Sequence, residues 1–196
     1  MLPMKRNTLT FAVLCFAASQ AVALSAKEID GVVLDKVTGK PVAGAVVLAT
    51  WNGRRSDLAH GASVCYHVET ARTDAAGNYR IAAWSEPFAW RRAIISDRTV
   101  WVQAFKAGYV RPTKGVSTGG KVFVIPKEQS TYFESLDRFF ISSICPEAGE
   151  SEKNLYPFLD AIVVEAKLVA QTPEQQATVK GMAYVRDRSP GAPVKR

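Results

Sequence analysis

Short apolar segments separated by turns make up the first two thirds of the chain. Segments rich in β-branched and aliphatic residues lie at 29–36, 44–50, 64–72, 79–84, 99–106 and 121–125. This pattern is typical of β-strands that bury one or both faces. Glycine, proline, asparagine and aspartate lie between them, notably at 37–41 and 74–78, where they permit tight turns. This part of the chain is therefore predicted to be mainly β.

The strand predicted at 99–106 has bulky residues on both faces. Alternation places the following residues on its two faces: Val100, Val102 and Ala104 on one, and Trp101, Gln103 and Phe105 on the other. One face can pack against a second sheet. The other face needs a different cover, so we expect the C-terminal part of the chain to supply it and Trp101 to lie in the core. The segments 51–63 and 85–98 are predicted to be loops.

Beyond residue 128 the apolar period changes to three and four residues, which predicts an amphipathic helix. Its apolar residues are Leu155, Phe158, Leu159, Ile162, Ala166 and Val169. Pro157 fits only the first turn of such a helix. Thr172, Pro173 and Gln175 form a start signal for a second helix. We therefore predict a helical extension at 128–188 and a disordered tail at 189–196.

The first residues are typical of an export signal. Lys5 and Arg6 precede an apolar run at 9–18, and small residues follow at 21–23. We predict a signal peptide at 1–23 and a periplasmic or secreted protein without a transmembrane helix, because the run is shorter than the about 20 residues that span a bilayer. Cys15 raises an outer-membrane lipoprotein as the alternative. Leu14 disfavours it, because lipid-modified cysteines normally follow Gly, Ala or Ser.

Cys65 and Cys145 remain after cleavage and are expected to form a disulfide, because export removes the chain from the reducing cytosol. Closing a separation of 80 residues stabilises a fold by about 4 kcal/mol. His60, Cys65, His67 and Cys145 also admit an alternative, a zinc site or a Cys–His nucleophile, since Cys65 and His67 are two apart and would share one strand face. We favour the disulfide.

Charge is divided unevenly along the chain. The net charge of +7 becomes +5 without Lys5 and Arg6. Residues 53–127 hold twelve Lys or Arg against five acids, and residues 128–174 hold nine acids against three bases. This division favours a basic sandwich that meets an acidic C-terminal segment. No helix or ribbon clusters its basic residues as nucleic-acid readers do, so nucleic acid is not an expected partner.

The sequence contains no recognisable catalytic centre. There is no glycine-rich phosphate loop and no serine nucleophile elbow, and the acids around Glu147, Glu150 and Glu152 are interpreted as a solvated surface. We therefore expect a non-enzyme without a cofactor or a metal. Phe88, Trp90, Arg91 and Arg92, in the long predicted loop, are the candidate contact with an envelope protein or a glycan.

Four short motifs resemble those of the carboxypeptidase regulatory-like domain, also called transthyretin-like or prealbumin-like. They are Gly31, TGKPVAGA at 38–45, TDAAGNY at 73–79 and Ala107-Gly108-Tyr109. The resemblance implies an immunoglobulin-like or prealbumin-like Greek-key β-sandwich at 27–127, with the helical segment packed on it. It also implies a binding or structural role.

The active relatives of this fold differ from this chain. The Tyr-Arg-Gly-Ser ending of the 5-hydroxyisourate hydrolases is absent, and the two-Tyr, two-His iron site of the related dioxygenases is not matched by His60 and His67. We predict an exported, non-enzymatic envelope module. The alternatives are a glycan or peptidoglycan binder that uses loop aromatics, and a hydrolase or metal site at His60, Cys65 and His67.

Overall fold

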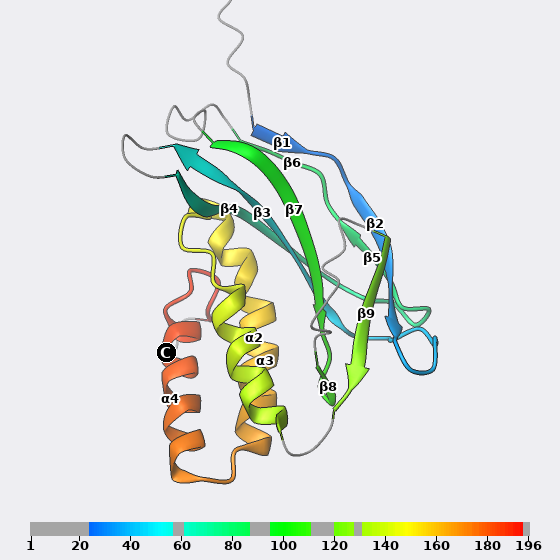
Figure 1. The fold of residues 1–196 in the computed structure, drawn as a ribbon, viewed down its shortest axis with the longest axis vertical. Coiled ribbons are helices and arrows are strands. Elements are labelled where there is room, and N and C mark those ends of the chain that lie inside the picture. The colour runs from blue at the N-terminus through cyan, green and yellow to red at the C-terminus, as the bar shows by residue number, and fades with distance from the viewer. Residues whose placement is uncertain (1–23, 57–60, 87–94, 111–119, 128–130, 194–196) are drawn as a thin grey trace, which may run out of the picture.

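The computed structural model describes residues 24–56, 61–86, 95–110, 120–127 and 131–193. These residues form a helical layer, a three-stranded sheet and a four-stranded sheet, with a two-stranded sheet at one end (Figure 1). The protein is mainly β, as predicted, and carries a C-terminal helical segment. The predicted signal peptide and Cys15 lie outside the described residues.

The strands and helices have the following bounds. The strands are β1 (Leu24–Ala26), β2 (Ile29–Asp35), β3 (Val46–Ser56), β4 (Gly61–Arg72), β5 (Asn78–Ile81), β6 (Trp84–Glu86), β7 (Ile95–Phe105), β8 (Tyr109–Val110) and β9 (Gly120–Pro126). The helices are α2 (Tyr132–Ser143), the 3₁₀ helix η2 (Gly149–Leu155), α3 (Tyr156–Val169) and α4 (Pro173–Asp187).

The strands form three sheets with the orders β4-β3-β7, β5-β2-β9-β8 and β1-β6. All pairs are antiparallel except β2 and β9, which run parallel. The strand predicted at 79–84 is divided, because β5 ends at Ile81 and pairs with β2, whereas β6 begins at Trp84 and pairs with β1.

The central strand β3 buries apolar side chains on both faces. Val47 and Ala49 pack into a core shared with the four-stranded sheet. Val46 and Leu48 pack into a second core built mainly from the helices, which includes Phe158. The C-terminal segment therefore covers the outer face of the β4-β3-β7 sheet, as expected.

The expectation for Trp101 was wrong, because its side chain is 53% exposed. Gln103, on the same face of β7, donates from Nε2 to Ser143 Oγ at 3.1 Å, at the last residue of α2. Trp101 lies two residues earlier on β7, beyond the end of this helix. The helical cover thus ends near Gln103 and leaves the indole in contact with solvent.

The loop predicted at 51–63 is mostly strand. β3 continues to Ser56 and β4 begins at Gly61, with Arg54 opposite Ser63. Trp51 and Val64 are buried in the core between the sheets and hold this end of the hairpin in place. Polar composition misled the prediction, because one face of the extended hairpin is available to polar side chains.

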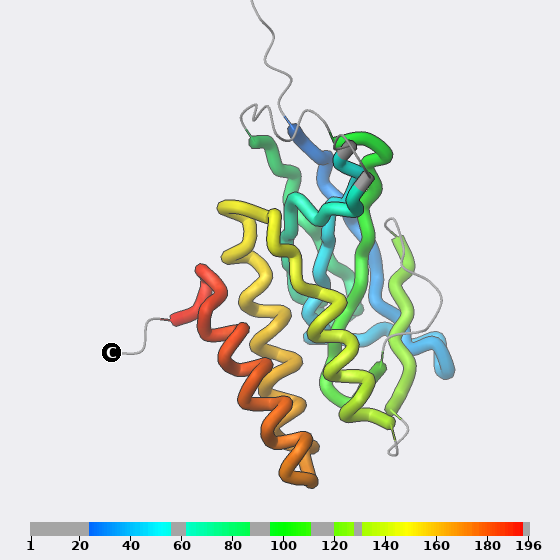
Figure 2. Tube along the Cα trace, turned by 60° about the vertical axis from the view of Figure 1, so that its left-hand side comes forward, coloured from blue at the N-terminus to red at the C-terminus, as the bar shows by residue number. Residues whose placement is uncertain are grey.

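α2 and α3 pack against the strands, and α4 packs on α3 and α2 (Figure 2). The two predicted helices are present, with Pro157 in the first turn of α3. Thr172 caps α4 in a reciprocal capping box with Gln175, as predicted. The prediction missed α2, which begins the helical layer.

The segment predicted as a tail packs on the protein as far as it is described. Ser189 is buried, and its N–H donates to the Arg186 carbonyl at 3.0 Å. Gly191 lies so close to the Lys153 carbonyl that a Cβ at this position would collide with it. Residues 194–196 lie outside the described residues.

A buried network joins the helices to the turn before β8. The Tyr132 hydroxyl donates to Glu165 Oε1 at 2.8 Å, and the Gly108 N–H donates to the Tyr132 oxygen at 2.8 Å. Burial raises the pKa of Tyr132, and the hydrogen bond to Glu165 raises it further. The phenol therefore stays protonated and keeps its donor role.

Asp35 organises the predicted turn at 37–41. Its Oδ1 accepts from the N–H groups of Thr38 at 3.0 Å and Val37 at 2.8 Å. Gly39 has a φ of 69° and donates its N–H to the Asp35 carbonyl at 2.8 Å. The hydrogen bond from Thr38 lowers the pKa of Asp35, with smaller contributions from Val37 and Tyr109, while burial acts in the opposite direction. The ionised carboxylate thus stabilises the turn.

We expect Asp35→Asn to be less stable than the parent near neutral pH, with the difference narrowing as the pH falls. The pKa of Asp35 is lower in the folded than in the unfolded state, so its contribution is present above the ordinary value of about 3.9 and is lost as the pH falls through the folded value. Urea unfolding across this range measures it. Asp137→Asn, on α2, is the control. A difference that does not change with pH would contradict the assignment.

Candidate functional site

Cys65 and Cys145 form the predicted disulfide, with their Cα atoms 5.2 Å apart. Cys65 packs at the edge of the core that contains the helices, and Cys145 follows the end of α2. The bond therefore ties the helical layer to β4. It also leaves neither sulfur as a thiolate for nucleophilic attack or metal binding.

Cys65 and His67 do not share a face, contrary to prediction. Trp51 of β3 is opposite His67, whereas the next residue, Asn52, is opposite Cys65. Tyr66 is the extra residue of this β-bulge, which breaks the alternation of the strand. Cys65 consequently faces the helices, while the His67 ring packs against Trp51 and Trp84 on the other side of the sheet.

His67 is buried between two carboxylates and two indoles. Its Nδ1 lies 2.8 Å from Glu86 Oε1, and its Nε2 lies 3.0 Å from Glu69 Oε1. Trp84 stacks on the ring with centroids 3.6 Å apart, and Trp51 meets it edge-on at 5.2 Å. Each ring nitrogen thus has a carboxylate oxygen within hydrogen-bonding distance, and the ring lies on the face of Trp84.

We name this group of five residues the His67 clamp. Both nitrogens of the ring already have partners, so the arrangement favours a structural role over that of a base or a metal ligand. It joins β3 and β4 to β6, whose last residue is Glu86. After the segment 87–94, the next described residue is Ile95, which is buried and lies opposite Arg55. The residues that flank that segment, Glu86 and Ile95, are therefore fixed to the sheets.

Several predicted site residues cannot be placed. Phe88, Trp90, Arg91 and Arg92, the candidate contacts, lie outside the described residues, and so does His60. The structure therefore brings together only Cys65 and Cys145 from the predicted sites. Within the part of the chain that is described, no group of three His, Cys, Asp or Glu side chains is arranged to hold a metal ion.

Among the helices of the described segments, none has both the length and the apolar character to cross a bilayer. The acidic segment meets the sandwich through Arg55, whose Nη1 lies 2.6 Å from Glu147 Oε2. Both side chains are partly exposed, so this ion pair contributes little to stability. Its signs agree with the predicted division of charge.

A shallow cleft of about 460 Å³ lies on the four-stranded sheet. Asp30, Arg80 and Lys121 line it, with Gly31 and Tyr79 beside them. A Cβ at Gly31 would collide with the Tyr79 hydroxyl, so glycine creates the space that this phenol occupies. The hydroxyl is buried and has no hydrogen-bond partner among the described residues. Burial, and then the charge of Asp30, raise the pKa of Tyr79 to about 12.

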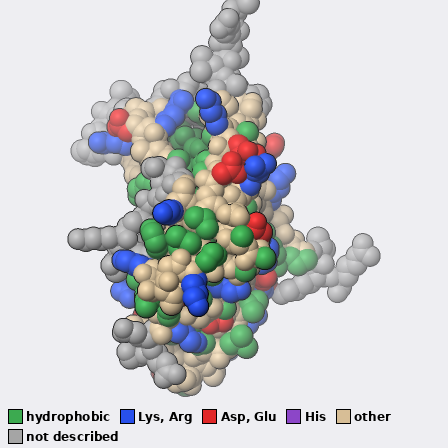
Figure 3. Space-filling view, turned by 90° about the vertical axis from the view of Figure 1, so that its right-hand side faces the viewer, with side chains coloured by type: hydrophobic (Ala, Val, Ile, Leu, Met, Phe, Trp, Pro, Cys, Tyr) green, Lys and Arg blue, Asp and Glu red, His purple; other side chains and the backbone are tan. Residues whose placement is uncertain are grey.

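The outer face of the same sheet carries an apolar strip along β2 and β9, and the described helices do not cover it. Val32, Leu34, Phe123 and Ile125 point outward, since they alternate with the buried residues of β2 and β9. All four are partly exposed, and Phe123 is 38% exposed. Figure 3 shows hydrophobic side chains on this side of the molecule, with lysines and arginines and some acidic side chains around them.

Sequence reasoning missed this outer face and the His67 clamp. The apolar residues of β2 predicted a strand, but nothing in the run indicated which face would lack a cover. Glu69 lies two residues from His67 and shares its face of β4, which was a usable signal. Glu86 is far away along the chain, and only the path of β6 brings it to the ring.

No protein-family model matches the chain, and no curated protein sequence matches it either. Among solved structures, a 9R-lipoxygenase from Cyanothece PCC8801 aligns at 10% identity with a TM-score of 0.29. The alignment covers 80% of this chain and 24% of the lipoxygenase. A similarity this weak carries no argument about fold or activity.

We expect His67→Ala to lower the free energy of unfolding by about 2 to 3 kcal/mol, because the hydrogen bonds of the ring with Glu69 and Glu86 and its stacking contact with Trp84 are lost. Chemical denaturation measures the change. Arg80→Ala is the matched control, since Arg80 also pairs with two acids but has a side chain 70% exposed. Its effect on the free energy of unfolding should be much smaller, because solvent screens exposed ion pairs. Equal effects of the two changes would show that the clamp has no special role.

Proposed function

We propose that this protein is an exported, non-enzymatic binding or structural module of the cell envelope. We further propose a Greek-key sandwich of the carboxypeptidase regulatory-like, prealbumin-like kind. The observation that carries the proposed role is a contrast between the two large sheets. The helices of the same chain cover the outer face of β4-β3-β7, whereas the apolar outer face of β5-β2-β9-β8 is partly exposed.

An exposed apolar face supports a binding role for a simple reason. Val32, Leu34, Phe123 and Ile125 form a contiguous group, because Leu34 lies opposite Phe123 across the β2–β9 pair. Contiguous apolar patches on soluble proteins commonly mark interaction sites. These side chains gain little from folding while they remain in contact with water, but they would gain from contact with a partner.

The chemistry-bearing side chains support binding over reaction. Cys65 is held in the disulfide, and both nitrogens of His67 have carboxylate partners. Both groups serve to fix elements of the fold. The disulfide is also the form that paired cysteines take after export to an oxidising compartment.

Trp101 favours a second candidate function, glycan or peptidoglycan binding. Its indole is 53% exposed on the middle of β7. On β3 the residue opposite is Thr50, and Asn52 and Thr99 form the next pair on the same face of the sheet. An exposed aromatic face beside hydroxyl and amide groups suits a sugar ring, which presents C–H groups on its face and hydroxyls at its edge. Trp90 remains the predicted contact in the segment 87–94.

Photo-crosslinking in the exporting cell tests the proposed role. We expect a photoreactive residue at position 123 to give specific adducts with envelope components, because Phe123 lies within the uncovered face. The same residue at position 168 is the control, since Leu168 is an exposed apolar residue (78%) on the helical layer. No adducts from position 123, or the same adducts from both positions, would contradict the proposal.

Position 90 tests the predicted loop in the same experiment, and adducts from it alone would assign the contact to that loop. The glycan alternative is tested by retention on immobilised wall polysaccharides. Retention that Trp101→Ala abolishes and Phe123→Ser leaves unchanged would favour that alternative.

A further inference from the structure

The turn between β2 and residue 41 presents an apolar side chain to solvent. Val37 is 73% exposed and lies between Lys36 and Lys40 along the chain. The turn is held by the hydrogen bonds of Asp35 described above and by the Asp35 N–H, which donates to the Lys40 carbonyl at 2.9 Å. Val37 is thus an apolar group held at the tip of an ordered turn.

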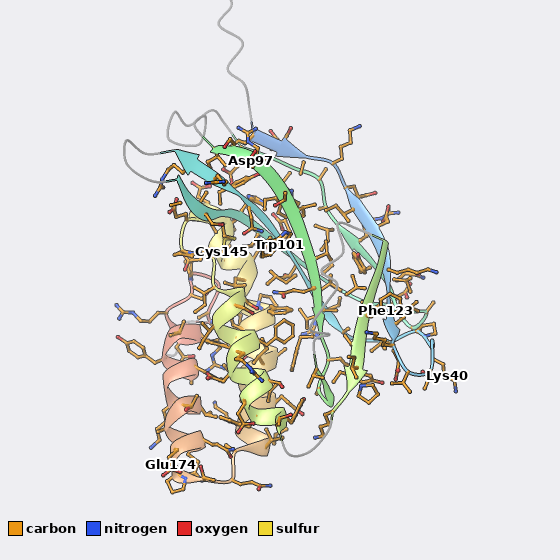
Figure 4. The ribbon with its side chains drawn as sticks, viewed as in Figure 1. Lys40, Asp97, Trp101, Phe123, Cys145 and Glu174 are labelled. Carbon is orange, nitrogen blue, oxygen red and sulfur yellow. A yellow bond between two sulfur atoms is a disulfide. The ribbon has the colours of Figure 1, made fainter. Side chains whose placement is uncertain are left out.

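The turn is continuous with the uncovered face of the four-stranded sheet. Leu34 directly precedes it and lies opposite Phe123, and the Lys36 N–H donates to the Val124 carbonyl at 2.8 Å. Figure 4 shows Phe123 and Lys40 on the side of the protein away from the helices. We name this surface the lysine-flanked face. It consists of Val32, Leu34, Val37, Phe123 and Ile125 together with Lys36, Lys40 and Lys121.

The charge of this face is positive. Lys36, Lys40 and Lys121 are exposed, and none of them forms an ion pair with another described residue. The nearby acids are occupied, because Asp30 and Glu28 lie 2.9 Å and 3.5 Å from Arg80 Nε. The Asp35 carboxylate is buried within the turn. Three lysines with no acidic partner among the described residues therefore accompany the apolar side chains.

We propose that the lysine-flanked face binds the surface of an anionic lipid bilayer. Val37 enters the boundary between headgroups and acyl chains, Leu34 and Phe123 follow at the interface, and the lysines lie against the headgroup phosphates. Apolar side chains with flanking cations are the combination that holds proteins at such an interface. The proposal deepens the proposed function, since it assigns a partner class to the same uncovered face.

Two other occupants fit less well. A second copy of the chain that docked through the same face would bring the lysines of the two copies together, and like charges oppose such contact. An acidic protein would satisfy the charge, but protein contacts depend on anchors that fill pockets. The cleft at Gly31, on this sheet, is shallow. A bilayer needs no such pocket.

The test is co-sedimentation of the exported protein with lipid vesicles. One set contains phosphatidylcholine alone, and in the other phosphatidylglycerol replaces part of it. We expect binding to the second set only, weakened by added salt because the lysines act through screened charge. Val37→Ser and the triple change Lys36→Gln, Lys40→Gln and Lys121→Gln should each lower the partition coefficient by about tenfold or more.

Matched control variants make the same change in net charge, and a comparable loss of apolar surface, on the helical layer. They are Leu168→Ser, and the triple change Lys153→Gln, Lys167→Gln and Lys180→Gln. These variants should bind as the parent does. Binding to both vesicle types, no binding to either, or equal losses for face and control variants would overturn the lipid proposal. Crosslinks from position 123 to an envelope protein, without vesicle binding, would overturn it too while leaving the proposed function intact.

Discussion

The fold depends on the need to bury both faces of the β4-β3-β7 sheet. β3 places Val47 and Ala49 on one face and Val46 and Leu48 on the other, and all four are buried. A single opposing sheet can cover only one of these faces. The helical layer is therefore part of the core of the protein, because without it the second set of apolar side chains would face water.

Two local devices on β4 hold this arrangement together. The disulfide from Cys65 to Cys145 fixes the end of α2 to β4. The His67 clamp acts on the opposite face of the same strand, where it fixes β6. The bulge at Tyr66 makes both possible, since it turns Cys65 and His67 to opposite faces although they are two residues apart. One irregularity in β4 thus separates a covalent anchor from an electrostatic one.

Much of the fold was predictable from local patterns. The alternation of β7 predicted that Phe105 would need a cover, and Phe139 and Phe158 of the helices supply it. The capping signal at Thr172 predicted where α4 begins. α2 was missed although its buried residues recur at three and four residue steps. The segment around it was interpreted by its acidic composition instead of its apolar period. Each of these confirmed predictions depends on interactions between residues a few positions apart, or on residues that share one face of a strand.

The features that the sequence did not predict depend on where elements distant along the chain end. Trp101 is exposed because α2 ends beside Gln103. The residues near Trp101 in the sequence do not indicate where that helix ends. Glu86 reaches His67 only through the path of β6, and the uncovered face of the four-stranded sheet is a property of the whole arrangement. The candidate binding surface also depends on the whole arrangement. The sequence therefore predicted a contact in the loop at 85–98, whereas the structure places the exposed apolar side chains on a sheet.

The most direct test of the central claim is to remove the helical layer. A chain that ends after Lys127 and carries Cys65→Ser is compared with the full chain carrying Cys65→Ser and Cys145→Ser, both by urea unfolding and near-ultraviolet circular dichroism. The full chain should unfold cooperatively, whereas the shortened chain should lack a cooperative transition and fixed aromatic packing, because one face of β3 is then open to water. A shortened chain that unfolds cooperatively with undiminished stability would contradict the account.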